Sequence, residues 1–433
     1  MDPLILALLG VVVMLFLIFL HVPIGVAMTL CGLVGFAQIA GWGPALSLLA
    51  NEPASTIANL DLAVVPLFML MGSLAALGGV ATDIFDLAAA LVGHRRGGLA
   101  TTTVVASGGF GAVCGSSVAT TATFGRVALP QMLERNYSPG LAAGSIAAGG
   151  TLGIIVPPSS IMILYCVLTE QSVLALFTAA IVPAVIAILS YVVVVRIVAQ
   201  RNPDAAPAGE RLSSRERMRA VANGWRPITL AITVLGGIYS GIFTVNEAAS
   251  VGVFLAFVFS LGRGRLTMRT FLGVLAEASA SSAMIYIMIF GATIFSYFIS
   301  ITGSASYLVE TVGGLSLPPL VVIFLFLAIY LVLGAIFDEV ASIVITLPFV
   351  LPVIVHFGYD PLWWGVINVM VVGTAMLTPP IGINVMLLHA MYKAIPLGTI
   401  YRGVAPFILV DLIRLVILTL FPQITLWLPS VLR

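Results

Sequence analysis

The groups best suited to chemistry gather at two double prolines inside apolar sequence, Pro157-Pro158 and Pro379-Pro380. Each pair lies mid-way along a run that is long enough to cross a bilayer. Because proline lacks a backbone N–H and clashes with the preceding helical turn, each pair is expected to break its helix. An open backbone group is costly in hydrocarbon, so such breaks persist only where they face protein or a polar cavity. Two breaks, one in each half, are typical of secondary transporters built from repeats.

Another interrupted apolar segment precedes each break. Residues 99–130 are rich in Gly, Ser, Thr and Ala, and their glycines predict a re-entrant hairpin with its tip near Gly115. Residues 318–352 are expected to form the second hairpin, with its tip within residues 334–342. Where half-helices end near mid-membrane, free carbonyls coordinate Na⁺ and positive N-terminal ends hold carboxylates.

The first tip and the first break together form a candidate site that has hydroxyls and carbonyls but no acid. This combination suits a hard monovalent cation held mostly by dipoles. The residues of this constellation are Gly115, Ser116, Ser117, Thr120, Gly153, Val156 and Pro157.

The second constellation contains two acids, and an ionisable residue inside a membrane is by default functional. The alternatives to a binding role are close helix packing for the small residues and an interfacial location for the acids. The residues of this constellation are Asp338, Glu339, Ser342, Gly373, Thr374, Thr378 and Pro379, with Gly382 and Asn384 beside the break.

The composition identifies the class of protein. Hydrophobic residues make up 61% of the chain and charged residues 8%, whereas a soluble domain has about 25% charged residues. The chain is therefore predicted to be an all-α integral membrane protein. Its net charge of +1 suggests no nucleic-acid partner. We find no nucleophile–base pair or metal-cluster spacing, so neither an enzyme nor a cofactor is predicted.

The two halves of the chain match each other at an offset of 222 residues, which places Pro139 on Pro361 and the first double proline on the second. We therefore predict two repeats. The first, 1–200, contains the hairpin 99–130 and a broken helix at 140–168. A connecting segment, 201–226, leads to the second repeat, 227–433, with the hairpin 318–352 and a broken helix at 363–390. A polar, partly helical loop is expected at 43–60, a loop at 301–317, and a last span at 404–428.

The distribution of basic residues orients the repeats. If Arg95 and Arg96 are cytoplasmic, counting the crossings places fifteen of the 18 Lys and Arg on that side, the exceptions being Arg126, Arg414 and Arg433. The two hairpins then enter from opposite sides, which predicts inverted repeats, and both termini face outward. Arg126 is expected to snorkel from the hairpin exit. Asp411 and Arg414 lie three apart on one helix and are expected to pair.

Four stretches carry a resemblance to a known family: CGSSVATTATFG, GGTLGIIVPPSS, GAIFDEVASIVITLP and GTAMLTPPIGINV. Together they resemble the large membrane subunit of the tripartite ATP-independent periplasmic (TRAP) transporters. The resemblance implies a sodium-driven, elevator-type importer in the bacterial inner membrane. It also implies a small four-helix membrane subunit as a separate polypeptide, and a periplasmic binding protein that delivers an organic anion.

The resemblance further implies roles for individual residues. The family's sodium sites map onto Ser116, Ser117, Gly153, Val156 and Pro157 in the first repeat, with Gly115 at the tip, and onto Gly334, Gly373, Thr378 and Pro379 in the second. Its substrate zone lies between the two tips, near Asp338 and Ser342. The further candidates for substrate binding are Ser116, Thr120, Glu339 and Asn384.

Other functions remain open on the sequence alone. A stand-alone sodium- or proton-coupled divalent-anion symporter would have a similar fold but would need no binding protein. An ion channel would need an open pore rather than two closed hairpins. The solute is also open, because C4-dicarboxylates, keto acids, sugar acids and sialic acid are all compatible with the family.

Overall fold

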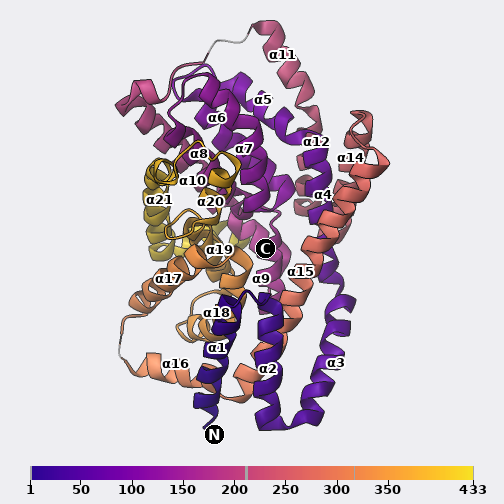
Figure 1. Cartoon of the computed structure of the whole chain (residues 1–433), viewed down its shortest axis with the longest axis vertical. Helices are drawn as coiled ribbons and strands as arrows, with labels where there is room; N and C mark the ends of the chain where they lie inside the picture. Colours follow the sequence, from indigo (N-terminus) through magenta and orange to yellow (C-terminus); the bar gives the residue numbers. More distant parts are fainter. Residues whose placement is uncertain (1, 210–212, 316, 433) are drawn as a thin grey trace.

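The structure, a computed structural model, describes residues 2–209, 213–315 and 317–432 (Figure 1). The regular elements of these residues are helices, apart from one isolated backbone bridge between Arg96 and Ala208. Eight helices in the described part of the chain are long and apolar enough to cross a membrane. The predicted all-α membrane fold is therefore confirmed.

The first half of the chain runs from α1 to α10. Short helices connect some of its elements, and two glycines separate α4 from α5. The helices are α1 (Pro3–Phe19), α2 (Ile24–Ala40), α3 (Trp42–Ala58), α4 (Val64–Leu77), α5 (Val80–Val92), α6 (Gly98–Cys114), α7 (Ser117–Glu134), α8 (Pro139–Ile155), α9 (Ser160–Thr169) and α10 (Val173–Arg201).

The second half begins with the connecting segment and ends with two helices in place of the expected single span 404–428. Pro422 lacks a backbone donor, and a new helix begins there. The helices are α11 (Ser214–Asn223), α12 (Trp225–Ala231), α13 (Gly237–Tyr239), α14 (Val245–Gly262), α15 (Met268–Ile301), α16 (Ser304–Gly314), α17 (Pro319–Ile336), α18 (Glu339–His356), α19 (Pro361–Ala375), α20 (Ile383–Met391), α21 (Leu397–Leu420) and α22 (Pro422–Val431).

The loop expected at 301–317 is wrong, because α16 occupies most of these residues, and the segment 43–60, expected as a partly helical loop, is almost wholly helical in α3. The polar residues Asn51 and Glu52 and the following Pro53 suggested a loop, yet all three lie within α3. This helix packs against α2 and α15. Tertiary packing of a helix face outweighs the weak local preference of such residues.

The helix ends in the two halves correspond closely. Helix α7 spans residues 117–134 and α18 spans residues 339–356, so both ends of the two helices differ by the same 222-residue offset. The helices that follow begin at Pro139 and Pro361, which the same offset relates. The local backbone plan of each half is thus the same at the hairpin and the broken helix.

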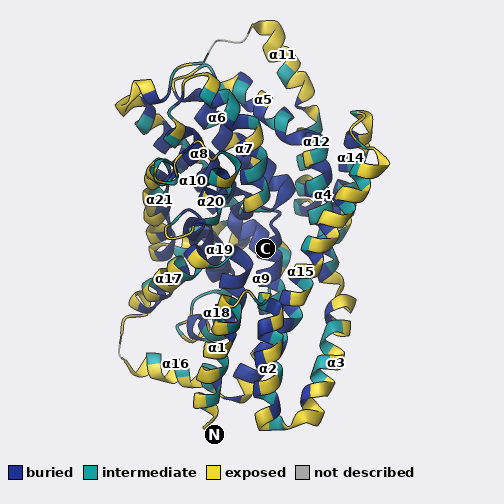
Figure 2. Ribbon diagram, viewed as in Figure 1, coloured by how far each residue is buried: buried dark blue, intermediate teal, exposed yellow. Residues whose placement is uncertain are grey.

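Two groups of helices face each other in Figure 1. On one side, α2 and α4 pack along the long helix α15, and α14 packs along α4. On the other side, α6, α7 and α21 surround α8. Figure 2 shows that the inner helices are almost wholly buried, whereas the outer faces of α3, α14 and α15 are exposed. The exposed side chains on these outer faces include large apolar ones, as expected of a surface that meets lipid or other membrane helices.

The two helical hairpins, α6–α7 and α17–α18, open at opposite ends of the molecule. Gly97, before α6, donates its N–H to the Ala206 carbonyl at 3.1 Å, and Ser138, after α7, donates to the Ala205 carbonyl at 3.0 Å. The second pair instead opens beside α16, where His356 lies against Gly313. Figure 1 shows α11 and α16 at opposite ends of the molecule. The two pairs therefore point their tips toward each other from opposite ends.

Candidate functional site

The first tip is closed by a short backbone turn between α6 and α7. Gly115 adopts a positive φ of 63°, which glycine tolerates at no steric cost, and Ser116 then caps α7 by accepting the Ala119 N–H. Thr120 donates its hydroxyl to the Ser116 carbonyl at 2.7 Å. Ser160, the first residue of α9, donates to the Gly115 carbonyl at 3.0 Å. The tip is thus fastened to the far side of the first break.

The first break packs directly against this tip. A methyl group built on Gly153 would lie 2.6 Å from the Ser116 carbonyl oxygen, so only glycine allows this approach. Helix α8 ends at Ile155, and extended backbone at Val156 leads into the buried Pro157-Pro158 pair. The structure therefore brings together the tip and the break, as the first candidate cation site requires.

Ser117 belongs to the same candidate site but contacts the other half of the chain. Its hydroxyl oxygen accepts a hydrogen bond from Nδ2 of Asn384, on α20, at 2.8 Å. Both side chains are fully buried. The C-terminal piece of the second broken helix thus supports the tip of the first hairpin.

The second tip repeats the first with different side chains. Asp338 caps α18 by accepting the Ala341 N–H at 2.7 Å, and Ser342 donates its hydroxyl to the Asp338 carbonyl at 2.9 Å. Asp338 and Ser342 are the residues that the 222-residue offset places on Ser116 and Thr120. Both tips therefore use one motif, a capping side chain plus a hydroxyl one turn later.

The second break is more open than the first. Thr378 is half-buried, Pro379 is exposed, and Thr378 donates its hydroxyl to the Thr374 carbonyl at 2.9 Å. A methyl group on Gly334 would lie 2.7 Å from Cβ of Ala375, at the end of α19. A methyl group on Gly373 would instead point toward α8. The structure thus groups Gly334 with the second break, while one face of Gly373 belongs to the contact between the two broken helices.

A cavity of about 400 Å³, here called the tip cavity, lies between the two tips and the helices α4 and α15. Three carboxylates line it, and none of the described lining residues is Lys or Arg. Its polar lining residues are Ser73, Ser116, Ser160, Glu277, Ser281, Asp338 and Glu339.

One acid of the tip cavity has spare hydrogen-bonding capacity. Asp338 is engaged in capping α18, whereas Oε2 of Glu339 is buried and has no hydrogen-bond partner among the described residues. A buried carboxylate oxygen in this state is costly until a donor or a cation meets it. The chemistry that the tip cavity offers is therefore binding of cations or hydrogen-bond donors beside hydroxyl groups.

The candidate substrate residues divide into two sets. Ser116, Asp338 and Glu339 line the tip cavity. Thr120, Ser342 and Asn384 do not line it; they are fully buried and make hydrogen bonds within or behind the tips. Their contribution to a site in this conformation is to hold the tips rather than to touch a solute.

Sequence reasoning missed the wall of the tip cavity that α4 and α15 supply. Glu277 was detectable, because it is an acid within an apolar span and such residues are functional candidates. Ser73 and Ser281 carry no comparable signal, since serine is common at helix contacts.

A second cavity of about 450 Å³, here called the vestibule, continues from the tip cavity. Both are lined by Ser73, Cys114 and Glu277, and the vestibule extends to Arg126 and Arg265. Arg126, expected to snorkel at the hairpin exit, thus lines this cavity. The two arginines give the vestibule the positive side chains that the tip cavity lacks.

Comparisons with known proteins agree with this architecture. The profile of the family described as "Tripartite ATP-independent periplasmic transporter, DctM component" matches residues 11–424. The "C4-dicarboxylate TRAP transporter large permease protein DctM" of Pseudomonas aeruginosa is 34% identical over 92% of this chain and 93% of its own. The "Sialic acid TRAP transporter large permease protein SiaM" of Vibrio cholerae is 29% identical over 96% of each chain.

A third relative, the "Ectoine/5-hydroxyectoine TRAP transporter large permease protein UehC" of Ruegeria pomeroyi, is 29% identical over 96% of each chain. Among solved structures, the YdaH transporter of Alcanivorax borkumensis superposes with a TM-score of 0.62 over 99% of each chain. At 14% identity this likeness concerns the fold alone. The three sequence relatives are named as large permease proteins and not as enzymes. The chain belongs to the tripartite ATP-independent periplasmic transporter family as its DctM component, the large permease subunit.

Proposed function

We propose that this chain is the large transmembrane subunit of a sodium-driven, elevator-type TRAP transporter that imports an organic anion. The observation that carries the proposal is the pair of tips. The tips share one capping motif at the 222-residue offset and meet at the tip cavity. The hairpins that carry them open toward opposite ends of the molecule. Two such half-sites with inverted orientation are the usual basis of alternating access in secondary transporters.

The substrate class is proposed from the relatives and from the fold. The relatives' names specify C4-dicarboxylates, sialic acid and ectoine, and carboxylate groups are common to all three. The tip that Ser116 caps presents a helix N-terminus, whose partial positive charge favours a carboxylate. We propose that an organic acid binds between the tips.

The charges of the tip cavity support coupling to a cation. Glu277, Asp338 and Glu339 would repel an organic anion that entered without positive ions. Sodium bound at the two breaks would offset this repulsion, with Gly115, Ser116, Ser117, Gly153, Val156 and Pro157 around the first ion. Gly334, Gly373, Thr378 and Pro379 would surround the second ion. Oxygen ligands and helix-end dipoles suit such a hard cation.

The partners follow from the family's tripartite description. We propose that a small four-helix membrane subunit braces this chain and that a periplasmic binding protein delivers the solute. The protein would then reside in the bacterial inner membrane with both termini on the periplasmic side. The alternative is a stand-alone symporter of related fold, which would transport without either partner.

Reconstitution in liposomes tests the proposal. The chain should accumulate a radiolabelled organic acid only with the small subunit, the cognate binding protein and an inward sodium gradient. Uptake by the chain alone would favour the stand-alone symporter. Undiminished uptake in sodium-free buffer, driven by a pH gradient, would contradict sodium coupling.

A further inference from the structure

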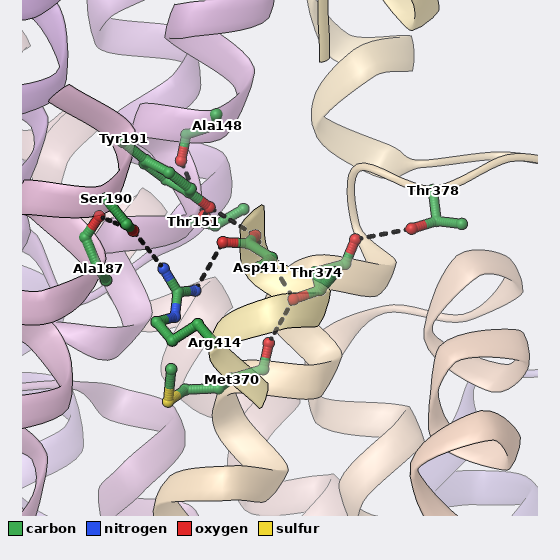
Figure 3. Close-up of polar contacts among 10 residues, drawn as sticks. All are labelled: Ala148, Thr151, Ala187, Ser190, Tyr191, Met370, Thr374, Thr378, Asp411 and Arg414. Carbon is green, nitrogen blue, oxygen red and sulfur yellow. Dashed lines mark hydrogen bonds and ion pairs between the residues drawn. The ribbon is translucent and has the colours of Figure 1, made fainter. Parts of the chain in front are cut away.

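A buried polar network surrounds Asp411 on α21 (Figure 3). Asp411 and Arg414 form the ion pair that their spacing predicted, with Oδ1 of Asp411 2.7 Å from Nη2 of Arg414. Asp411 is 0% exposed and Arg414 is 3% exposed. Since replacing a buried ion pair by apolar residues is often neutral or stabilising, the pair is weak evidence for a role in stability alone.

One arm of the network reaches the first broken helix. Tyr191, on α10, donates its hydroxyl to Oδ2 of Asp411 at 2.6 Å. Oγ1 of Thr151 lies 3.0 Å from the Tyr191 oxygen and 2.8 Å from the backbone carbonyl three residues earlier, so its single proton can serve only one of these two acceptors at a time. Thr151 lies on α8 within one turn of Gly153, which packs against the first tip. The guanidinium of Arg414 lies over the Tyr191 ring, 5.5 Å from its centre.

A second arm reaches the second broken helix. Oγ1 of Thr374, on α19, lies 3.5 Å from Oδ2 of Asp411 and 2.9 Å from the Met370 carbonyl. The carbonyl of the same Thr374 accepts the hydroxyl of Thr378, a member of the second candidate cation site. One carboxylate oxygen of Asp411 is therefore shared between the arms that lead to the two breaks.

The two broken helices also touch each other beside this carboxylate. A methyl group on Gly373 would lie 3.3 Å from Cδ1 of Ile154 and 3.7 Å from Cβ of Thr151. A shift of α8 relative to α19 would therefore change both this contact and the distances to Asp411. Contiguous packing and hydrogen bonding of this kind are the physical means by which two sites influence each other.

We infer that Asp411 is a positioning residue that couples the two candidate cation sites, so that filling one break favours filling the other. The inference rests on the proposed function, because it takes sodium as the ion at both breaks. It adds that the two sites are formed together, through Tyr191 on one side and Thr374 on the other. Such coupling is reciprocal, since each ion must raise the affinity for the other by the same factor.

The experiment is a sodium titration of the purified full-length chain, with the increase in unfolding temperature as the readout. The wild-type response should have a Hill slope above one. Tyr191→Phe removes only the hydroxyl and should reduce the slope to one, with about a fivefold increase in half-effective sodium, at the low end of usual coupling factors. The matched control is Tyr137→Phe, which removes a buried hydroxyl that accepts the Leu99 N–H at 3.2 Å, at the base of the first hairpin. It should lower the unfolding temperature but leave the slope unchanged.

A second pair of variants covers the case in which Tyr191→Phe does not fold. Thr374→Val removes the hydroxyl at similar volume and should reduce the Hill slope to one. Thr374→Ser keeps the hydroxyl and should retain a Hill slope above one. Wild-type slopes in both Tyr191→Phe and Thr374→Val, with lowered stability alone, would overturn the inference. A wild-type slope of one would overturn it as well, while leaving sodium coupling intact. No sodium response in the wild-type chain would refute sodium binding itself and the inference with it.

Discussion

The close approach of the first tip to the first broken helix makes Gly153→Ala a direct test of the first candidate cation site. The added methyl would lie 2.6 Å from the Ser116 carbonyl oxygen and 2.6 Å from Oγ1 of Thr120. Real Cβ atoms essentially never come within 3.0 Å of another heavy atom, so the gap must open by about 0.4 Å. The Ser116 oxygen belongs to the backbone and cannot rotate away.

The magnitude follows from the cost of overpacking. Extra methyl groups in a tightly packed interior cost about 1–3 kcal/mol. If this cost falls on the arrangement that holds sodium, the half-saturating sodium concentration should rise between about 5-fold and 150-fold. We expect at least about a fivefold increase in uptake assays with reconstituted liposomes, and a matching shift in sodium-dependent thermal stabilisation.

The matched control is Gly108→Ala in the neighbouring helix α6. Its methyl would lie 2.8 Å from Cδ1 of Ile188, which is the free end of a flexible side chain. Both substitutions replace a helical glycine, so the gain in helix propensity of up to about 1 kcal/mol is common to both and cancels. If folded Gly153→Ala and Gly108→Ala proteins show the same half-saturating sodium concentration, the assignment of a cation to this contact is refuted.

Three more predictions concern topology, charge and support of the tip. A cysteine placed near Lys393 should react only with membrane-permeant reagents. A cysteine near Asp360 should react with impermeant reagents added outside. Reaction of both cysteines from the same side of the membrane would exclude the inverted repeats. Glu339→Gln removes one of the three negative charges that line the tip cavity and should raise half-saturating sodium about tenfold, which corresponds to about 1.4 kcal/mol; an unchanged sodium response would place this carboxylate outside the ion path. Asn384→Ala removes the 2.8 Å hydrogen bond to Ser117 and should cost about 1–3 kcal/mol of unfolding free energy, measured by thermal unfolding with and without sodium; an unchanged unfolding temperature would show that the bond contributes nothing.

The positions of the breaks could be predicted from the sequence because covalent constraints act locally. Single prolines such as Pro53 and Pro183 remain inside helices, whereas the paired prolines at 157–158 and 379–380 each remove two successive backbone donors, and no helix continues through either pair. The turn at Gly115 is similar, since its positive φ of 63° is one that glycine adopts readily. The pairing of Asp411 with Arg414 was also predictable, because residues three apart on a helix share a face.

The direction in which each side chain points could not be predicted in the same way. Thr120 and Ser342 were assigned to the solute, yet their hydroxyls satisfy the carbonyls of the capping residues and are buried. Rotation of a helix about its axis is set by contacts with other helices, which one sequence does not specify. For the same reason, the polar wall formed by Ser73 and Ser281 from α4 and α15 was not foreseen.

The two tips show how a repeat can supply geometry while single side chains supply chemistry. Ser116 and Asp338 occupy equivalent positions and cap their helices through the same bond to the residue three positions later. The serine adds no charge, whereas an aspartate at a helix N-terminus brings a full negative charge that the helix dipole stabilises by about 0.3–1 kcal/mol. The next equivalent pair, Ser117 and Glu339, differs in the same sense. One backbone plan therefore provides a neutral capping sequence at the first tip and an acidic one at the second. An ion held by dipoles at the first tip would depend on close packing, whereas an ion or donor at the second would depend on charge. The size substitution at Gly153 and the charge substitution at Glu339 therefore test the two proposed sites separately.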